Sequence, residues 1–309
     1  MRYVRISWIA LLATFLALSV SGIAGNAPDP YTANFGNESI DQTHSDLNSS
    51  DRVEMKTIGV IGGVSWVSSI EYYRLLNEMV AERLGGLHSA KVLMYSIEFG
   101  EFSEQERLAE KGDWNALDGI IIDAAQRLKR GGADFIIIAS NTVNSRADYI
   151  EGAVGLPVLH IADATGEKVN ECGIKTVALL GTKYTMEQAF YRERLENYGL
   201  NVVVPNETER NTINTVIFDE LCAGKFYNSS KERFIQIINR LVDEEGAEGV
   251  ILGCTEIPLL IKQEDVSTPV FDTTAIHCEA AVKYALNGTR PAWGTAAKRT
   301  GESQTKMVP

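Results

Sequence analysis

The chain contains the same strand-and-turn sequence twice. Residues 132–142 read GADFIIIASNT and residues 246–256 read GAEGVILGCTE, and the two segments align without a gap. Each contains a short, continuous apolar run, which is typical of a strand buried on both faces of a parallel sheet. A strand that occurs twice, with polar residues directly after it, makes the chain a candidate for internal duplication, and further matches in the same order are needed to establish it.

Two further segments repeat in the same order. KTIGVIGG at 56–63 matches KTVALLGT at 175–182, and LPVLHIAD at 156–163 matches TPVFDTTA at 268–275. Amphipathic stretches such as NALDGIIIDAAQRLKRGG separate the apolar runs, so strands and helices alternate. The predicted fold class is α/β, with two pseudo-symmetric flavodoxin- or Rossmann-like domains, each containing a parallel sheet. The active site is expected in the cleft between them, at the carboxyl ends of the strands.

The first residues differ from the rest of the chain. MRYVR is basic, ISWIALLATFLALSV is apolar and SGIAG is small, which is the order of a secretory signal peptide. The apolar run is shorter than the ~20 residues of a membrane-spanning helix. We therefore expect a secreted protein with no membrane contact after cleavage; a signal anchor and a wrongly assigned gene start are the alternatives.

The predicted division of the chain is a signal peptide at 1–24, a disordered linker at 25–54, a first α/β domain at 55–160 plus 271–290, a second at 161–270 and a disordered tail at 291–309.

Charge and cysteine content exclude some partners. The formal net charge of −12 argues against nucleic acid and anionic lipid, because phosphates would be repelled. The cysteines show no metal-ligand spacing and are expected to be mostly free thiols, although two disulfides are an alternative: Cys172, Cys222, Cys254 and Cys278. Secretion would make the Asn-x-Ser/Thr sequons glycan sites: Asn37, Asn48, Asn206, Asn228 and Asn287.

Ser140 and Cys254 occupy equivalent positions directly after the two repeated strands. In two facing halves they would flank one cleft, which suits chemistry at both faces of a single carbon. Backbone N–H groups and a helix dipole at Cys254 would favour its thiolate, so we expect its pKa below the usual ~8.5. A thiolate there could remove a proton from carbon. The alternative is that both side chains are simply packed at strand ends.

Other polar residues near the strand ends could bind a substrate carboxylate and stabilise the negative charge that grows on deprotonation. The predicted substrate-binding residues are Gly63, Ser65, Asn141, Thr142, Thr182, Thr185 and Thr255, with Asn144 and Glu256 in support. Plain tight turns are the alternative at both strand-to-helix turns. His160 and His277 are expected to be structural, and Trp66, Tyr72 and Tyr73 to lie in the core.

These segments resemble the aspartate/glutamate racemase family, and most closely its bacterial amino-acid racemases specific for L-aspartate and L-glutamate. The likeness runs from about Met55 to about Ala285 and is strongest in GADFIIIASNT and GVILGCTE. It implies an enzyme that racemises aspartate or glutamate without PLP, metal or other cofactor, and that is commonly a homodimer. It also implies that two cysteines act as base and acid on opposite faces of Cα. By the same resemblance Cys222 would line the side-chain pocket, but buried packing is the expectation that we favour for it.

The first site departs from the family pattern, which is Cys-Asn-Thr-x-His. Here Ser140 replaces the cysteine and Asn144 the histidine. A hydroxyl is far less acidic than a thiol, and without an adjacent base it is a poor proton acceptor. We therefore predict asymmetric racemisation, with Cys254 thiolate as the base and Ser140, or a water that it holds, on the opposite face.

Two other functions stay open at this point. A decarboxylase-like member of the superfamily would need only one cysteine, because only one face of the carbon is protonated. A secreted amino-acid-binding protein with weak catalysis would keep the cleft and lose turnover. The choice between aspartate and glutamate also stays open.

Overall fold

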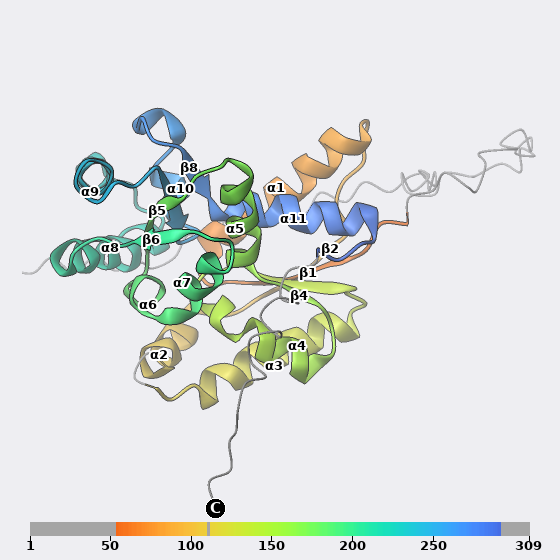
Figure 1. The fold of residues 1–309 in the computed structure, drawn as a ribbon. Helices are drawn as coiled ribbons and strands as arrows, with labels where there is room; N and C mark the ends of the chain where they lie inside the picture. The colour runs from red at the N-terminus through yellow and green to blue at the C-terminus, as the bar shows by residue number, and fades with distance from the viewer. Residues whose placement is uncertain (1–53, 110–111, 292–309) are drawn as a thin grey trace, which may run out of the picture. The chain divides into compact units, whose positions relative to one another are not determined.

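Each half of the chain forms a parallel sheet of four strands (Figure 1). The computed structural model describes residues 54–109 and 112–291. The predicted signal peptide lies outside the described residues. So do the predicted linker, except for its last residue, and the predicted tail, except for its first residue. The strand order is β2-β1-β3-β4 in the first sheet and β6-β5-β7-β8 in the second. The matching order confirms the predicted α/β fold with two similar parallel sheets.

The strands are short and mostly buried. Their bounds are β1 Ile58–Gly62, β2 Val92–Ser96, β3 Phe135–Ile138, β4 Val158–Leu159, β5 Thr176–Gly181, β6 Asn201–Val203, β7 Gly249–Gly253 and β8 Val270–Asp272. The repeated apolar runs are β3 and β7, and every residue of both strands is buried. Their continuous apolar sequence follows from this position, because helices cover both faces of each sheet.

Helices connect the strands, as Figure 1 shows. Their bounds are α1 Trp66–Leu84, α2 Phe99–Ala109, α3 Asn115–Arg130, α4 Ala147–Val154, α5 Ile161–Glu171, α6 Lys183–Glu187, α7 Ala189–Glu196, α8 Glu207–Asp219, α9 Asn228–Glu245, α10 Ile257–Leu260 and α11 Thr273–Asn287. The 3₁₀ helices are η1 Val143–Arg146, η2 Leu221–Ala223 and η3 Gln263–Asp265. No helix within the described ranges is long and apolar enough to cross a membrane.

Two helices exchange sides between the sheets. α5 begins directly after β4 of the first sheet but packs its apolar residues on β5 and β7 of the second. α11 begins directly after β8 of the second sheet and packs on β1 and β3 of the first. Phe271 and Asp272 pair with β7, so the boundary predicted at 271 is two residues early. Asp272 ends β8 and also caps α11, because its side chain accepts from the backbone N–H groups of Thr274 and Ala275; strand and helix therefore meet at this residue.

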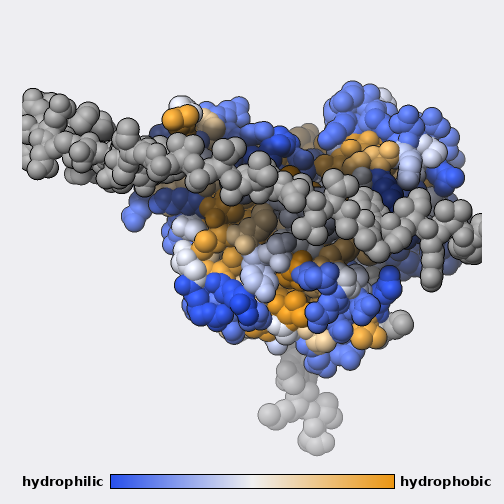
Figure 2. All heavy atoms as spheres, turned by 180° about the vertical axis from the view of Figure 1, so that it is seen from behind, coloured by the Kyte–Doolittle hydropathy of each residue, from blue (hydrophilic) through white to orange (hydrophobic). Residues whose placement is uncertain are grey.

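The aromatic residues of α1 divide between core and solvent. Tyr72 is fully buried, as predicted, but Trp66 and Tyr73 are each 57% exposed, so their predicted core positions are wrong. At 3.6 residues per turn, Tyr72 shares the buried face of α1 with Leu76, whereas Trp66 and Tyr73 lie on another face. On the side of the protein seen in Figure 2, apolar areas likewise lie between hydrophilic ones.

Three of the sequons lie within the described residues. Asn206, Asn228 and Asn287 are all exposed. Asn206 caps α8 by accepting a hydrogen bond from the backbone N–H of Glu209. Asn37 and Asn48 lie outside the described residues.

Candidate active site

The carboxyl ends of the two sheets meet around a narrow cavity, called the inner cavity below. The turns after β1 and β3 face the turns after β5 and β7, and α2, α8 and η2 also contribute to its wall. The inner cavity has a volume of about 20 Å³, which is room for one water-sized molecule. Most of the predicted site residues line it: Ser65, Ser140, Asn141, Thr142, Thr182, Cys254, Thr255 and Glu256.

Cys254 is hydrogen-bonded to a carboxylate. It follows β7 directly, and its Sγ donates to Oε2 of Glu256 over 3.1 Å. Glu256 also accepts from the Ser65 hydroxyl at 2.9 Å and from the Ser65 backbone N–H at 3.3 Å. Thr255 Oγ1 lies 2.9 Å from Glu256 Oε2 and 3.0 Å from Ser68 Oγ. The carboxylate of Glu256, which accepts the hydrogen bond of the Cys254 thiol, therefore also connects the turn after β7 to the turn after β1.

The environment of Cys254 does not favour a thiolate at rest. Burial, followed by the negative charge of Glu256, raises the pKa of the Cys254 thiol well above its usual value. The predicted lowering of this pKa is therefore wrong. Helix α10 starts only at Ile257 and is four residues long, so it offers a weak dipole against the cost of burying a thiolate. The resting state is a neutral thiol whose proton points at a carboxylate.

Ser140 occupies the corresponding place after β3 but lacks such a partner. Its Oγ accepts a hydrogen bond from the backbone N–H of Val143 at 3.3 Å. Thr142 stands where the repeat places Glu256, and its hydroxyl lies 2.9 Å from Thr182 Oγ1 and 3.3 Å from Thr185 Oγ1. No hydrogen bond between Ser140 Oγ and a carboxylate or an imidazole occurs in the described part of the chain.

The two sides of the inner cavity are built in the same way. On one side, the turn after β7 meets the turn after β1 through Glu256 and Ser65. On the other, the turn after β3 meets the turn after β5 through Thr142 and Thr182. The architecture is repeated, and the side chains at the matching positions differ.

Asn141 carries an unpaired acceptor at the inner cavity. Its Nδ2 donates to Thr273 Oγ1 at 3.0 Å, and the Thr273 hydroxyl donates to the Leu252 carbonyl at 2.8 Å. The only hydrogen of that hydroxyl is thereby used, so the amide nitrogen of Asn141 must face Thr273. Oδ1 of Asn141 is then left buried without a hydrogen-bond partner. An ammonium or hydroxyl group of a bound molecule would satisfy it.

Three predicted site residues lie behind the inner cavity wall. Asn144 donates to the Ser140 carbonyl at 2.6 Å and accepts from the Ile161 backbone N–H at 3.1 Å, so it joins β3 to the start of α5. Thr185 is fully buried beside Thr182. Gly63 has φ +86°, and a Cβ there would lie 2.2 Å from the carbonyl oxygen of Ile97, so the turn requires glycine for space.

The histidines are structural, as predicted. His160 caps α5 through Nδ1, which accepts from the Ala162 backbone N–H at 3.1 Å. Its burial, followed by the charge of Arg194, lowers its pKa well below the usual range. His277 lies 3.0 Å from the Tyr72 hydroxyl and 3.0 Å from the Leu159 carbonyl, and burial lowers its pKa to about 4. Neither histidine lines the inner cavity.

Part of the inner cavity wall was not predicted. Besides the residues above, it contains Val64, Phe99, Glu106, Ile217, Phe218 and Cys222. Cys222 lines the inner cavity and is also packed, partly buried, against the core of the second half. One signal in the sequence could have identified Glu106. On α2 it follows Phe102 by four residues and precedes Ala109 by three, so an acidic residue occupies the buried face of an amphipathic helix.

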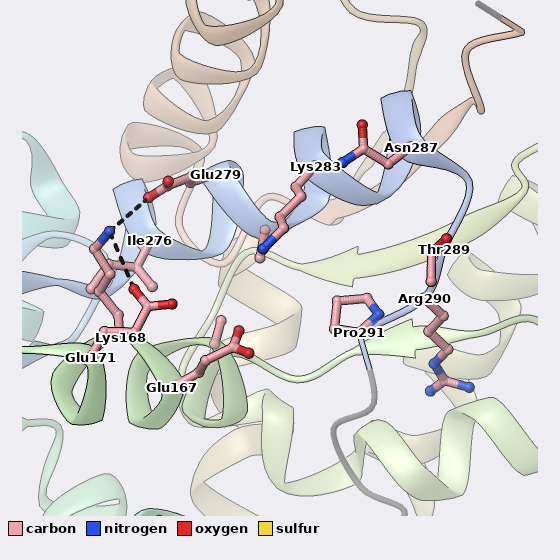
Figure 3. A pocket seen from close by; sticks show the side chains of 12 residues that line it. Glu167, Lys168, Glu171, Ile276, Glu279, Lys283, Asn287, Thr289, Arg290 and Pro291 are labelled. Atoms are coloured by element: carbon pink, nitrogen blue, oxygen red, sulfur yellow. Dashed lines mark ion pairs between the residues drawn. The ribbon is translucent and has the colours of Figure 1, made fainter.

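A roomier cavity, of about 370 Å³, lies between α5 and α11 (Figure 3). Lys168 forms two ion pairs in its wall: Lys168 Nζ lies 3.6 Å from Glu279 Oε2 and 3.8 Å from Glu171 Oε2. It contains no cysteine or serine among its described lining residues. No group of His, Cys, Asp and Glu in the described ranges could hold a metal ion. All four cysteines of the chain are free thiols.

The chain is similar in sequence and fold to known proteins. Residues 61–281 match the Asp/Glu/hydantoin racemase family. The crystal structure of a candidate Asp/Glu racemase from Yersinia pestis is 49% identical, with a TM-score of 0.68 over 75% of this chain and 100% of that one. An aspartate racemase homologue from Pyrococcus horikoshii OT3 is 40% identical, with a TM-score of 0.65 over 75% and 99%. The broad specificity amino-acid racemase RacX of Bacillus subtilis is 24% identical over 56% of this chain and 74% of RacX.

The matched residues include both repeated strands and the turns that carry Ser140 and Cys254. They also make up most of the chain, so the protein belongs to the Asp/Glu/hydantoin racemase family.

Proposed function

We propose that the protein racemises an amino acid by removing the proton at Cα on one face and returning a proton on the other. Cys254 is the base and Ser140 holds the opposite position. The observation that carries this proposal is the Cys254–Glu256 hydrogen bond of 3.1 Å at the wall of a cavity that Ser140 also lines.

Glu256 explains how a thiol of raised pKa can act as a base. When substrate binds, the proton on Cys254 Sγ moves to Oε2 of Glu256, along the hydrogen bond already present. The positive charge of the substrate ammonium favours the thiolate that forms. The thiolate then takes the Cα proton, and the electron pair of that C–H bond moves into the substrate carboxylate as an enediolate.

The polar residues around the inner cavity stabilise this intermediate. Thr142, Thr182 and Thr255 line it, and on substrate binding their hydroxyl groups can turn from their present hydrogen bonds and donate to the growing charge on the substrate carboxylate. Asn141 Oδ1, which lacks a hydrogen-bond partner in the structure, can accept from the substrate ammonium. Each of these steps uses groups of the chain itself.

The return of the proton differs between the two directions. In one direction Cys254 is the base, and the proton comes from the Ser140 hydroxyl or from a water that it orients. Solvent then restores the proton of Ser140 or of the water, and Glu256 releases to solvent the proton that it received from the thiol. In the other, Ser140 must remove the proton although no carboxylate or imidazole among the described residues is hydrogen-bonded to its Oγ. The chemical step should then be slower, whereas the equilibrium ratio of the enantiomers is unchanged.

A volume of about 20 Å³ is too small for an amino acid. Binding therefore requires the turns of the two sheets to move apart and to close again around the substrate, which would also exclude water. The acidic substrate and the homodimer, both implied by the resemblance, stay predictions, as does secretion.

Exchange of the Cα proton with solvent tests the proposal. The purified protein is incubated with each enantiomer of an amino-acid panel in D2O, and deuterium at Cα and the enantiomer ratio are followed. We expect deuterium uptake with faster initial exchange from one enantiomer. Absence of exchange from every amino acid, in a protein shown to be folded, would refute the racemase proposal. Equal initial rates from both enantiomers would refute the asymmetry alone.

A further inference from the structure

Exposed apolar side chains are concentrated in one place. Eight large apolar or aromatic side chains are exposed among the described residues, and five of them lie in two segments, on α1 and between η2 and α9. We call these five the seam patch: Trp66, Ile70, Tyr73, Phe226 and Tyr227, each between 45% and 57% exposed. The other three, Leu87, Leu108 and Tyr149, lie on three different segments.

The two segments of the seam patch are in contact. α1 packs against η2, and a Cβ added at Gly224, which ends η2, would lie 3.9 Å from Cγ2 of Val67 on α1. The three patch residues on α1 are spaced at four and three positions, so they share one face of the helix. The seam patch therefore spans α1 of the first half of the chain and the connection from η2 to α9 of the second half.

The seam patch is large for an exposed surface. An aromatic side chain offers ~150–250 Å², so five side chains that are about half exposed present roughly 400–600 Å². That area is at the upper end of what the surface of a monomer carries. It would supply the apolar core of an interface to which each partner contributes about 800 Å². Aromatic residues are enriched in such cores.

The charges beside the seam patch favour a second copy of the chain as its occupant. Glu71, Arg74 and Glu78 lie beside it on α1, and Arg74 pairs with Glu71 at 2.7 Å. With a net charge of −12, two copies repel each other over most of their surfaces, and an anionic lipid surface would be repelled as well. At the seam patch an uncharged stripe lies beside charges of both signs. Around a twofold axis the arginine of each copy can therefore face carboxylates of the other, and one self-complementary patch is sufficient.

Both segments of the seam patch also contribute to the wall of the inner cavity. Ser65 directly precedes α1, and its hydroxyl donates to Glu256 at 2.9 Å. Cys222, in η2, lines the same cavity. A copy that covers the seam patch would hold these two wall segments, one from each half of the chain, in a fixed arrangement. The opening that a substrate requires would then occur at another part of the wall, where α2 and α8 enclose an adjoining cavity of about 210 Å³.

We propose that a second copy of the chain docks on the seam patch and thereby fixes the Ser65 and Cys222 segments relative to each other. The resemblance implies a homodimer without giving its interface, and the seam patch supplies one. The effect on the site rests on the racemase function proposed above, whereas the docking does not.

Sedimentation velocity tests the docking. The protein is produced without glycosylation, because Asn228 is a predicted glycan site next to Tyr227, and is measured over a concentration range on the order of 0.1 to 100 µM. We expect a dimer whose dissociation constant rises by about 100-fold or more in Ile70→Glu, because docking would bury the new charge of both copies in apolar surface. Tyr73→Glu, on the same face of α1, should act likewise.

Tyr149→Glu is the matched control. It places the same charge at an exposed position of α4, on the other face of the first sheet (Figure 1), and should leave the dimer intact. A monomer at every concentration, or a dimer that Ile70→Glu and Tyr73→Glu leave unchanged, would overturn the proposal. A monomer that pellets with phosphatidylcholine vesicles would overturn it too, because lipid would then be the occupant.

Dilution separates the docking from the racemase function. Cα deuterium exchange per molecule should fall by about tenfold or more across the concentrations at which the dimer dissociates, because the wall segments lose their fixed arrangement. Exchange per molecule that stays constant while the dimer dissociates would refute the effect on the site. No exchange from any amino acid, together with a dimer that Ile70→Glu disrupts, would refute the racemase function and leave the docking surface intact.

Discussion

The turns after β3 and β7 occupy equivalent positions in two similar sheets, yet only one presents a proton acceptor beside its reactive side chain. After β7, Cys254 donates to Glu256 at 3.1 Å. After β3, Ser140 accepts from a backbone N–H, and Thr142 stands at the position of Glu256. Both turns are tied to the opposite sheet by short hydrogen bonds, at 2.9 Å in each case.

The comparison separates architecture from chemistry. The repeated strand and its partner turn place a side chain at the inner cavity on both sides. What the side chain can do depends on the residue two positions later, which is a carboxylate on one side and a hydroxyl on the other. The duplicated scaffold therefore accounts for the place of the proposed reaction, and the unequal pair is the reason we predict different rates in its two directions.

Removing the thiol should have the largest effect. Cys254→Ala deletes the proposed thiolate base of one direction and the proton donor of the other, and we expect Cα deuterium exchange to fall by about 10³-fold or more for both enantiomers. Cys172→Ala, which removes an exposed thiol outside the site, is the matched control. Retention of full exchange by Cys254→Ala would mean that the Ser140 side suffices, and would break the comparison.

Removing the carboxylate should have the next largest effect. Glu256→Gln deletes the group that receives the thiol proton, and we expect kcat to fall by about 10²-fold. The same change should move the pH profile. The charge of Glu256 raises the pKa of Cys254, so its loss should lower that pKa and shift the alkaline rise of kcat/KM to lower pH.

The measurement is kcat/KM between pH 6 and pH 9 for both proteins. Glu264→Gln removes an exposed acid from the same half of the chain and should leave the profile in place. A shift to higher pH in Glu256→Gln would contradict the assigned role. An unchanged profile with lower kcat would make Glu256 structural only.

The sequence was sufficient for the fold because its signals are local. Continuous apolar runs with glycine at their ends predict buried parallel strands, and β3 and β7 lie where these runs predict them. The same alignment placed Ser140 and Cys254 at equivalent turns, and both line the inner cavity. The repeated sequence pattern adopts the same strand and turn in both halves of the chain.

Other features depend on contacts between distant segments. The raised pKa of Cys254 arises from burial between two sheets, which the position of Cys254 after a strand does not reveal. The sequence marks Glu106 only by its place on the buried face of α2; that this face lies at the cavity, beside residues of α8, depends on the packing of the two halves. The exposure of Trp66 depends on which face of α1 is covered. In each case the deciding partner is remote in sequence.

Replacing the serine should reduce the difference between the two sides. Ser140→Cys restores a thiol, a better acid and base than a hydroxyl. We expect exchange from the slower enantiomer to rise by about tenfold, which would bring the ratio of the two initial rates closer to one. Ser229→Cys adds a thiol at an exposed position of α9 and should not change this ratio. A ratio that moves away from one would show that Ser140 does not limit the slower direction.

The smallest effect should come from the hydroxyl pair on the Ser140 side. Thr182 caps α6 by accepting from the Thr185 backbone N–H at 3.1 Å, and it lies 2.9 Å from Thr142 Oγ1. Thr182→Ala should lower the free energy of unfolding by about 1 kcal/mol, measured by urea denaturation, because a cap and a buried hydrogen bond are lost.

Ser65→Ala is the matched change on the Cys254 side. It should lower the free energy of unfolding by about 2 kcal/mol, because the Ser65 hydroxyl donates to the buried carboxylate of Glu256. It should also change the pH profile of exchange, whereas Thr182→Ala should not. If Thr182→Ala moved the profile as far as Ser65→Ala, the Ser140 side would contain a titrating group of its own, and the two turns would be chemically equivalent after all.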